Sequence, residues 1–143
     1  MPEGDEAERE ESLPDVIEIR LPQNSDYLPL LRATVGVLAG IMSFNYDEII
    51  QLRLAVSDAF SLAARRAGPD SAIASEISMQ FVVAAEKIEI LIQNRPFIGR
   101  IDTELEMESC AFLESLMDEV AFDGEAENDP LITMTKYITV GQV

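Results

Sequence analysis

Asp58 and Leu62 are the residues whose types and spacing bear most directly on chemistry. They lie four positions apart in RLAVSDAFSLAARRA, which has helical character, so their side chains share one helix face. A carboxylate such as Asp58 can act as a general base. Leu62 has no lone pair to offer a hard cation, which requires oxygen ligands. The pair therefore retains an acid but lacks a metal ligand beside it.

Composition excludes several other kinds of site. The chain has 143 residues, which is enough for one domain with one core, contains no His, and has Cys110 as its single cysteine. Zinc sites, His bases and internal disulfides are therefore not expected. We expect Cys110 to be a buried, inert thiol, with a redox role as the alternative. The chain has no apolar run near the ~18 residues of a membrane span and begins with the acidic MPEGDEAEREE, so we expect a cytoplasmic protein.

The net charge of −17 argues against nucleic acid as a ligand, because phosphates would be repelled over most of the surface. It favours a basic protein partner, with simple solubility as the alternative. The first eleven residues are too polar to pack and hold six acids: Glu3, Asp5, Glu6, Glu8, Glu10 and Glu11. We therefore expect an acidic flexible tail over residues 1–14 and one domain over residues 15–140.

Hydrophobic periodicity predicts the elements that position these residues. Helical spacing predicts a helix through LLRATVGVLAGIM with a cap at Ser25 or Asp26, and a longer helix from a cap at Tyr46 or Asp47 to the Gly68-Pro69 stop. A third helix is predicted over residues 107–122. Strands are predicted at residues 16–21, 77–83, 87–93 and 131–139. Strands clustered in this way predict an α+β fold, a two-layer sandwich with three helices on one face of a mainly antiparallel sheet.

Three motifs in this order resemble one known family. YDEI leading into LRLAVSDA, then ESLMDEV, then MTKY are similar to the anti-sigma factor and serine-protein kinase family, which controls bacterial stress and sporulation sigma factors. That family is a branch of the superfamily of histidine kinases, gyrase and the Hsp90 chaperone. The likeness spans roughly residues 16–138. It implies the Bergerat-type ATP-binding fold of that superfamily.

The family's nucleotide site is altered at the matching positions of this chain. Leu62 stands where the family has the Asn that holds Mg²⁺. IQNRPFIGR replaces an Asp-x-Gly-x-Gly segment that reads adenine, leaving Asn94 as a neutral substitute. Glu106, Met107 and Ser109 replace a Gly-rich phosphate turn, and Glu106 would repel phosphate. The resemblance therefore implies no bound nucleotide cofactor, no metal, and a pseudo-kinase in place of an active enzyme.

Asp58 matches the position of the family's Glu base. It is either a residual base or a helical acid without catalytic duty, and loss of the metal ligand favours the second interpretation. Arg65 and Arg66 could hold phosphate, but arginines near a helix C-terminus more often complement the helix dipole. We therefore interpret Asp58 as a vestigial base.

The resemblance implies two activities for this scaffold, sequestering a sigma factor and phosphorylating a serine of its antagonist. Only the second needs ATP, so we expect an anti-sigma-like regulator that binds a sigma factor or the antagonist in a partner-switching stress response. The alternatives are a residual ATP-dependent serine-protein kinase and an adaptor without its own sigma factor. Arg32 matches a position that contacts both partners, unless it is an ordinary solvated arginine. A homodimer through residues 16–21 and 36–40 is also expected.

Overall fold

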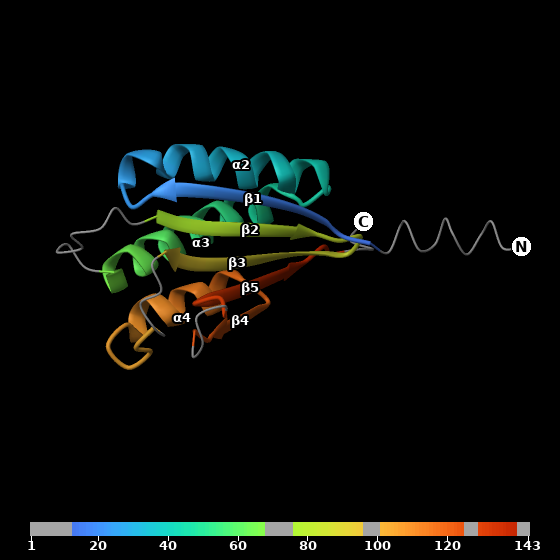
Figure 1. Cartoon of the computed structure of the whole chain (residues 1–143). Helices are drawn as coiled ribbons and strands as arrows, with labels where there is room; N and C mark the ends of the chain where they lie inside the picture. The colour runs from blue at the N-terminus through green and yellow to red at the C-terminus, as the bar shows by residue number, and fades with distance from the viewer. Residues whose placement is uncertain (1–12, 68–75, 96–100, 125–128, 140–143) are drawn as a thin grey trace, which may run out of the picture.

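Five strands form one antiparallel sheet in the computed structural model, which describes residues 13–67, 76–95, 101–124 and 129–139. The sheet order is β1-β2-β3-β5-β4. The strands are β1 (Asp15–Pro22), β2 (Glu76–Val83), β3 (Lys87–Arg95), β4 (Glu119–Phe122) and β5 (Ile132–Tyr137). Helices α2 (Leu28–Ile41), α3 (Tyr46–Ala67) and α4 (Met107–Leu116) lie together, with α3 between the other two (Figure 1). The predicted α+β architecture is confirmed.

The core lies between the sheet and α3. Alternate residues of the central strands point into it, and the antiparallel register places Met79 opposite Ile92 and Phe81 opposite Ile90. Phe60 of α3 is also buried there. On the other face of the sheet Gln80 donates a hydrogen bond to the Glu18 carboxylate at 3.1 Å. Within the described residues, no helix combines the length and the apolar character needed to cross a membrane.

A capping box starts α3. The Asn45 side chain accepts a hydrogen bond from the Glu48 N–H at 2.8 Å, and the Glu48 carboxylate accepts one from the Asn45 N–H at 2.9 Å. The predicted cap at Tyr46 or Asp47 is therefore wrong by one or two positions. The long helix itself is confirmed, and its predicted stop at residues 68–69 lies outside the described residues.

The start of α2 differs from the prediction. Asn24 accepts a hydrogen bond from the Asp26 N–H and caps a short 3₁₀ helix, η1 (Ser25–Tyr27), and α2 follows at Leu28 without a side-chain cap. Pro29 lies in the first turn of α2, where it costs no hydrogen bond. The predicted capping of α2 by Ser25 or Asp26 is thus wrong, because these residues form the preceding turn.

The third helix is shorter than predicted. It ends at Leu116, because Met117 takes an extended backbone with φ −114° and ψ 159°. The residues that follow form β4, whose Val120 lies opposite Met134 of β5. Residues 119–122 therefore continue the sheet, and the prediction of a helix over residues 107–122 is wrong in its last third. Residues 1–12 of the predicted acidic tail lie outside the described residues.

Candidate functional site

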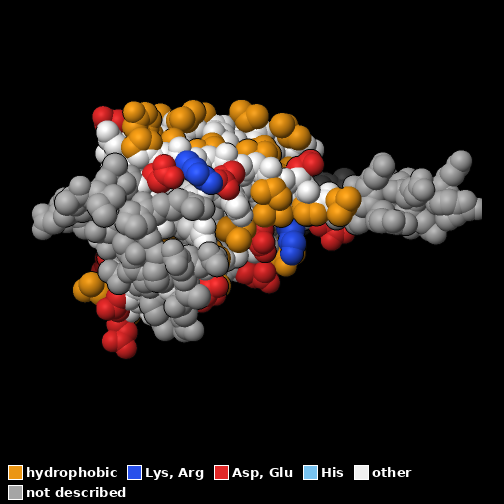
Figure 2. Space-filling model, in the orientation of Figure 1, with side chains coloured by type: hydrophobic (Ala, Val, Ile, Leu, Met, Phe, Trp, Pro, Cys, Tyr) orange, Lys and Arg blue, Asp and Glu red, His pale blue; other side chains and the backbone are white. Residues whose placement is uncertain are grey.

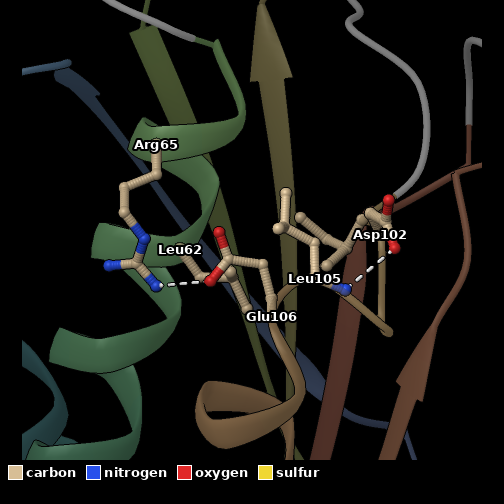
Figure 3. Close-up of a pocket in the computed structure, with 6 residues that line it drawn as sticks. Leu62, Arg65, Asp102, Leu105 and Glu106 are labelled. Atoms are coloured by element: carbon tan, nitrogen blue, oxygen red, sulfur yellow. Dashed lines mark hydrogen bonds and ion pairs between the residues drawn. The ribbon is translucent and has the colours of Figure 1, made fainter.

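A cavity of about 280 Å³ separates the C-terminal half of α3 from the segment that leads into α4. Figure 3 shows side chains from both elements converging on it. Its lining residues are Leu62, Arg65, Ile101, Asp102, Leu105 and Glu106. This cavity therefore contains two of the positions where the sequence matches the family's nucleotide site, Leu62 and Glu106.

Leu62 forms an apolar part of the cavity wall. Its side chain is 1% exposed and belongs to the hydrophobic core. One helical turn earlier, the Oδ2 atom of Asp58 is buried and accepts no hydrogen bond from any described residue. Burial raises the pKa of Asp58, the positive charge of Arg65 lowers it, and Glu106 raises it further. Leu62 of the predicted pair therefore lines the cavity, and Asp58 interacts electrostatically with two of its lining residues and gives up its proton less readily than an exposed Asp.

Arg65 links α3 to the start of α4. Its guanidinium donates to the Glu106 carboxylate at 3.2 Å and to the Ser109 hydroxyl at 3.0 Å, and Figure 3 shows the first of these contacts. The sequence suggested that Arg65 either holds phosphate or, as the favoured interpretation, complements the dipole of α3. In the structure the positive charge of Arg65 is paired with the Glu106 carboxylate, so Arg65 is not free to bind phosphate. The side chain of Arg66 lies outside the described residues.

In the segment where the family has its phosphate loop, this chain forms a turn whose backbone N–H groups are hydrogen-bonded within the turn. The Asp102 carboxylate accepts hydrogen bonds from the backbone N–H groups of Glu104 and Leu105, both at 3.1 Å. The Glu106 N–H is bonded to the Asp102 carbonyl at 2.9 Å. These three N–H groups are therefore already used, whereas a phosphate loop leaves such groups free for its ligand. Met107 follows with its side chain exposed.

Asn94 connects β3 to α3. Its Nδ2 atom donates to the Ala63 carbonyl at 2.7 Å, and its buried Oδ1 atom accepts no hydrogen bond within the described part of the chain. Asn94 does not line the cavity. The predicted substitute for the adenine-reading Asp is therefore tied to the helix backbone through its amide nitrogen.

These residues do not fit a magnesium nucleotide in the manner of the family. Leu62 supplies no oxygen ligand, Glu106 places negative charge at the cavity, and the backbone N–H groups of the turn are occupied. The cavity volume of about 280 Å³ is also slightly below the roughly 300–1,000 Å³ of small-molecule sites. Leu62, Glu106 and the hydrogen-bonded turn therefore all alter the same cavity.

Arg32 lies on the other side of α3, in a groove between α2 and α3. Its Nε atom donates to the Ser57 hydroxyl at 2.8 Å, and the side chain is half-buried. The groove has a volume of about 170 Å³ and is also lined by Ile50, Arg53 and Leu54. The structure thus places the predicted partner-binding arginine on a surface separate from the cavity.

The outer face of α2 is apolar. Leu30, Val37 and Ile41 are 51%, 63% and 73% exposed, and they recur at the spacing of one helix stripe. Figure 2 shows a row of hydrophobic side chains along the edge of the molecule formed by α2. The opposite stripe of the same helix, which includes Leu31 and Val35, is buried against the core. An amphipathic helix needs only one apolar stripe, so the outer stripe of α2 is a candidate interaction surface.

Cys110 is buried, as expected from its sequence context. Burial raises the pKa of its thiol, and the nearby carboxylates of Glu114, Glu106 and Asp58 raise it further. The reactive thiolate is therefore disfavoured.

Comparison with known proteins identifies relatives along most of the chain. No protein-family model matches it. The chain is similar to serine-protein kinase RsbW of Staphylococcus aureus strains JH9, Newman and bovine RF122 / ET3-1. Each is 29% identical over 150 aligned positions, which cover 93% of this chain and 93% of the relative. The resemblance to the anti-sigma factor and serine-protein kinase family is confirmed.

The relatives also correct one expectation. Each is named a serine-protein kinase, which contradicts the prediction that the chain is a pseudo-kinase and not an enzyme. That prediction rested on the residues at single motif positions such as Leu62 and Glu106. Motif positions alone do not exclude a catalytic site that draws on other residues of the same scaffold.

Proposed function

Given that this chain is a homologue of the RsbW serine-protein kinases, we propose that it is a cytoplasmic anti-sigma-like regulator that sequesters a sigma factor by direct binding. The observation that carries the proposal is the exposed apolar stripe on the outer face of α2; Arg32 of the same helix lies on the side that faces α3. Exposed apolar patches rimmed by polar groups mark protein interaction sites. In a partner-switching stress response, an antagonist protein would compete for this surface.

Gel filtration of the purified chain with each purified sigma factor of the source organism tests the proposal. We expect one sigma factor to co-elute with the chain and to lose transcription from its own promoter in vitro. Val37→Asp should abolish the complex, because it places a charge in the apolar stripe. Ala121→Asp, at an exposed position of β4, is the matched control and should leave the complex intact. Failure of every sigma factor to bind would contradict the proposal.

A homodimer belongs to the same proposal. β1 pairs only with β2 among the described strands, so the other edge of β1 is open for pairing with a second copy. Light scattering should therefore give twice the 15.8 kDa mass of one chain. A single species of one-chain mass at micromolar concentration would refute the dimer.

Serine-protein kinase activity is the second candidate function. The name of the relatives favours it, and so does Asp58, whose raised pKa suits a base that accepts a proton from a serine hydroxyl. The test is transfer of labelled phosphate from ATP to the antagonist that displaces the sigma factor. Serine phosphorylation that is lost in Asp58→Asn would establish this activity. Absence of transfer with the unaltered chain would remove it without affecting the binding proposal.

A further inference from the structure

Two arginines have no carboxylate partner within the part of the chain that the structure describes. The structure describes four arginine side chains, and two of them are ion-paired to glutamates: Arg20 to Glu18 at 2.7 Å and Arg65 to Glu106 at 3.2 Å. Arg32 and Arg53 form no ion pair with any described carboxylate. The chain has 27 acidic and 10 basic residues, so most of its charge is negative and these two guanidinium groups are local exceptions.

These two guanidinium groups line the same groove. Arg32 reaches it from α2, while Ile50, Arg53 and Leu54 occupy one face of α3 at i, i+3 and i+4 spacing. Ser57 accepts a hydrogen bond from the Arg32 Nε atom at 2.8 Å and donates one to the Arg53 carbonyl at 2.9 Å. The Ser57 contact therefore holds the Arg32 side chain in place and leaves its terminal nitrogens for an external acceptor.

The dimensions of the groove favour a protein side chain as its occupant. Its volume of about 170 Å³ is below the roughly 300–1,000 Å³ of small-molecule sites. Leu54 is 46% exposed, so an apolar group that covered it would gain contact area. The groove therefore suits one aliphatic side chain with negative charge beside it.

We propose that this groove binds an acidic segment of a protein partner, with an aliphatic side chain between Ile50 and Leu54 and flanking carboxylates on Arg32 and Arg53. The inference rests on the proposed protein-binding function and adds Arg53 and its two apolar neighbours as determinants of specificity. Guanidinium–carboxylate pairs are frequently bidentate, which makes them geometrically selective. The rest of this acidic surface repels such a segment, so the two arginines determine where along the surface it binds.

Nuclear magnetic resonance titration of the full chain with a defined peptide tests the groove. The probe is N-acetylated, C-amidated Glu-Leu-Glu-Glu-Leu-Glu, and its control has Gln in place of each Glu. We expect the probe to shift the Arg32 and Arg53 side-chain Nε–H signals and the Leu54 amide, and to bind at least fivefold more tightly than the control peptide. Arg53→Ala should weaken binding about tenfold and Arg53→Lys less. Arg20→Ala removes the same charge from β1 and should change the affinity less than twofold.

Several outcomes would refute the proposal that this groove binds an acidic segment. They are no binding up to about 10 mM probe, equal affinity for both peptides, shifts confined to other surfaces, or equal losses in Arg53→Ala and Arg20→Ala. If the probe binds here but no sigma factor does, only the sigma-factor proposal fails. If a sigma factor is bound with the same affinity by the unaltered chain and by Arg53→Ala, only the groove fails.

Discussion

The two sides of α3 differ in whether their charged groups have partners within the chain and whether nearby apolar side chains are covered. On the cavity side, Arg65 is bonded to Glu106 and Ser109, and the Asp102 carboxylate accepts two backbone N–H groups. On the side that faces α2, Arg32 and Arg53 have no carboxylate partner among the described residues, and the outer stripe of α2 is exposed. Arg65 and the turn at Asp102 therefore have hydrogen-bond partners within the chain, although the Asp58 Oδ2 atom beside them accepts none from the described residues. Arg32 and Arg53, in contrast, leave guanidinium nitrogens for another molecule.

This difference indicates where binding energy remains available. A donor that already has a partner in the free protein must lose that contact before it binds a ligand, so its net contribution is small. A preorganised guanidinium without a partner has no such contact to lose. The α2–α3 surface is therefore the stronger candidate for partner binding, and the cavity is the better place to look for stability effects.

Leu62→Asn should have the largest effect. It replaces a side chain that is 1% exposed with an amide that has no partner in the core, so we expect the free energy of unfolding to fall by about 3 kcal/mol. Urea denaturation measures this change. Leu54→Asn, at a half-exposed position of the same helix, is the control and should cost less than about 1 kcal/mol. If Leu62→Asn were as mild as its control, the cavity wall would not be part of the packed core.

Arg32→Ala should have the next largest effect, on binding. Loss of a central guanidinium contact costs about 2 kcal/mol, or roughly thirtyfold in affinity for the captured sigma factor. The free energy of unfolding should fall by no more than about 1 kcal/mol, because only the hydrogen bond to Ser57 is lost. Calorimetric titration and urea denaturation of the same variant measure both quantities. A normally folded variant with unchanged affinity would show that the partner binds elsewhere.

Asp58→Asn should reveal a pH dependence. Burial raises the folded-state pKa of Asp58 above its ordinary 3.8, so the folded chain binds more protons than the unfolded chain between these two pKa values. The carboxyl group therefore supports stability at low pH, and this support is lost as pH rises through the folded pKa. The stability of Asp58→Asn relative to the unaltered chain should increase from pH 4 to pH 7. We expect this change in relative stability to be modest, because Asp58 is only half-buried.

Urea denaturation at several pH values measures that trend. Glu104→Gln, at an exposed position, corrects for the change in net charge. A stability difference between Asp58→Asn and the unaltered chain that stays constant from pH 4 to pH 7 would refute the role of burial.

Much of the fold could be predicted because long elements repeat their hydrophobic pattern many times. The 22 residues of α3 carry several turns of consistent spacing, and β2 and β3 alternate clearly. The segment at residues 117–122 is short, and its apolar residues fit the end of a helix as well as a strand. This segment forms a strand because Val120 pairs with Met134 of β5, and the local spacing of apolar residues does not reveal that contact.

The site was predictable only where helical spacing applied. Asp58 and Leu62 share a face because they are four residues apart; Leu62 lines the cavity, and Asp58 interacts electrostatically with its lining residues Arg65 and Glu106. The contact of Arg65 with Glu106 joins positions 41 residues apart, so no local pattern could predict it. The hydrogen bonds of Asp102 were likewise missed, although Asp is a common first residue of such turns.

Arg65→Gln should have the smallest effect, and it tests whether the cavity side depends on its ion pair. The Arg65 and Glu106 side chains are 48% and 26% exposed, so we expect the free energy of unfolding to fall by only about 0.5 kcal/mol. Arg20→Gln, which breaks the exposed pair with Glu18, is the matched control and should cost no more. Arg65 also lowers the pKa of Asp58, so its loss should be less costly when Asp58→Asn is already present. A fall in the free energy of unfolding above about 2 kcal/mol would mean that this ion pair, and not the packed core around Leu62, holds α3 and the start of α4 together.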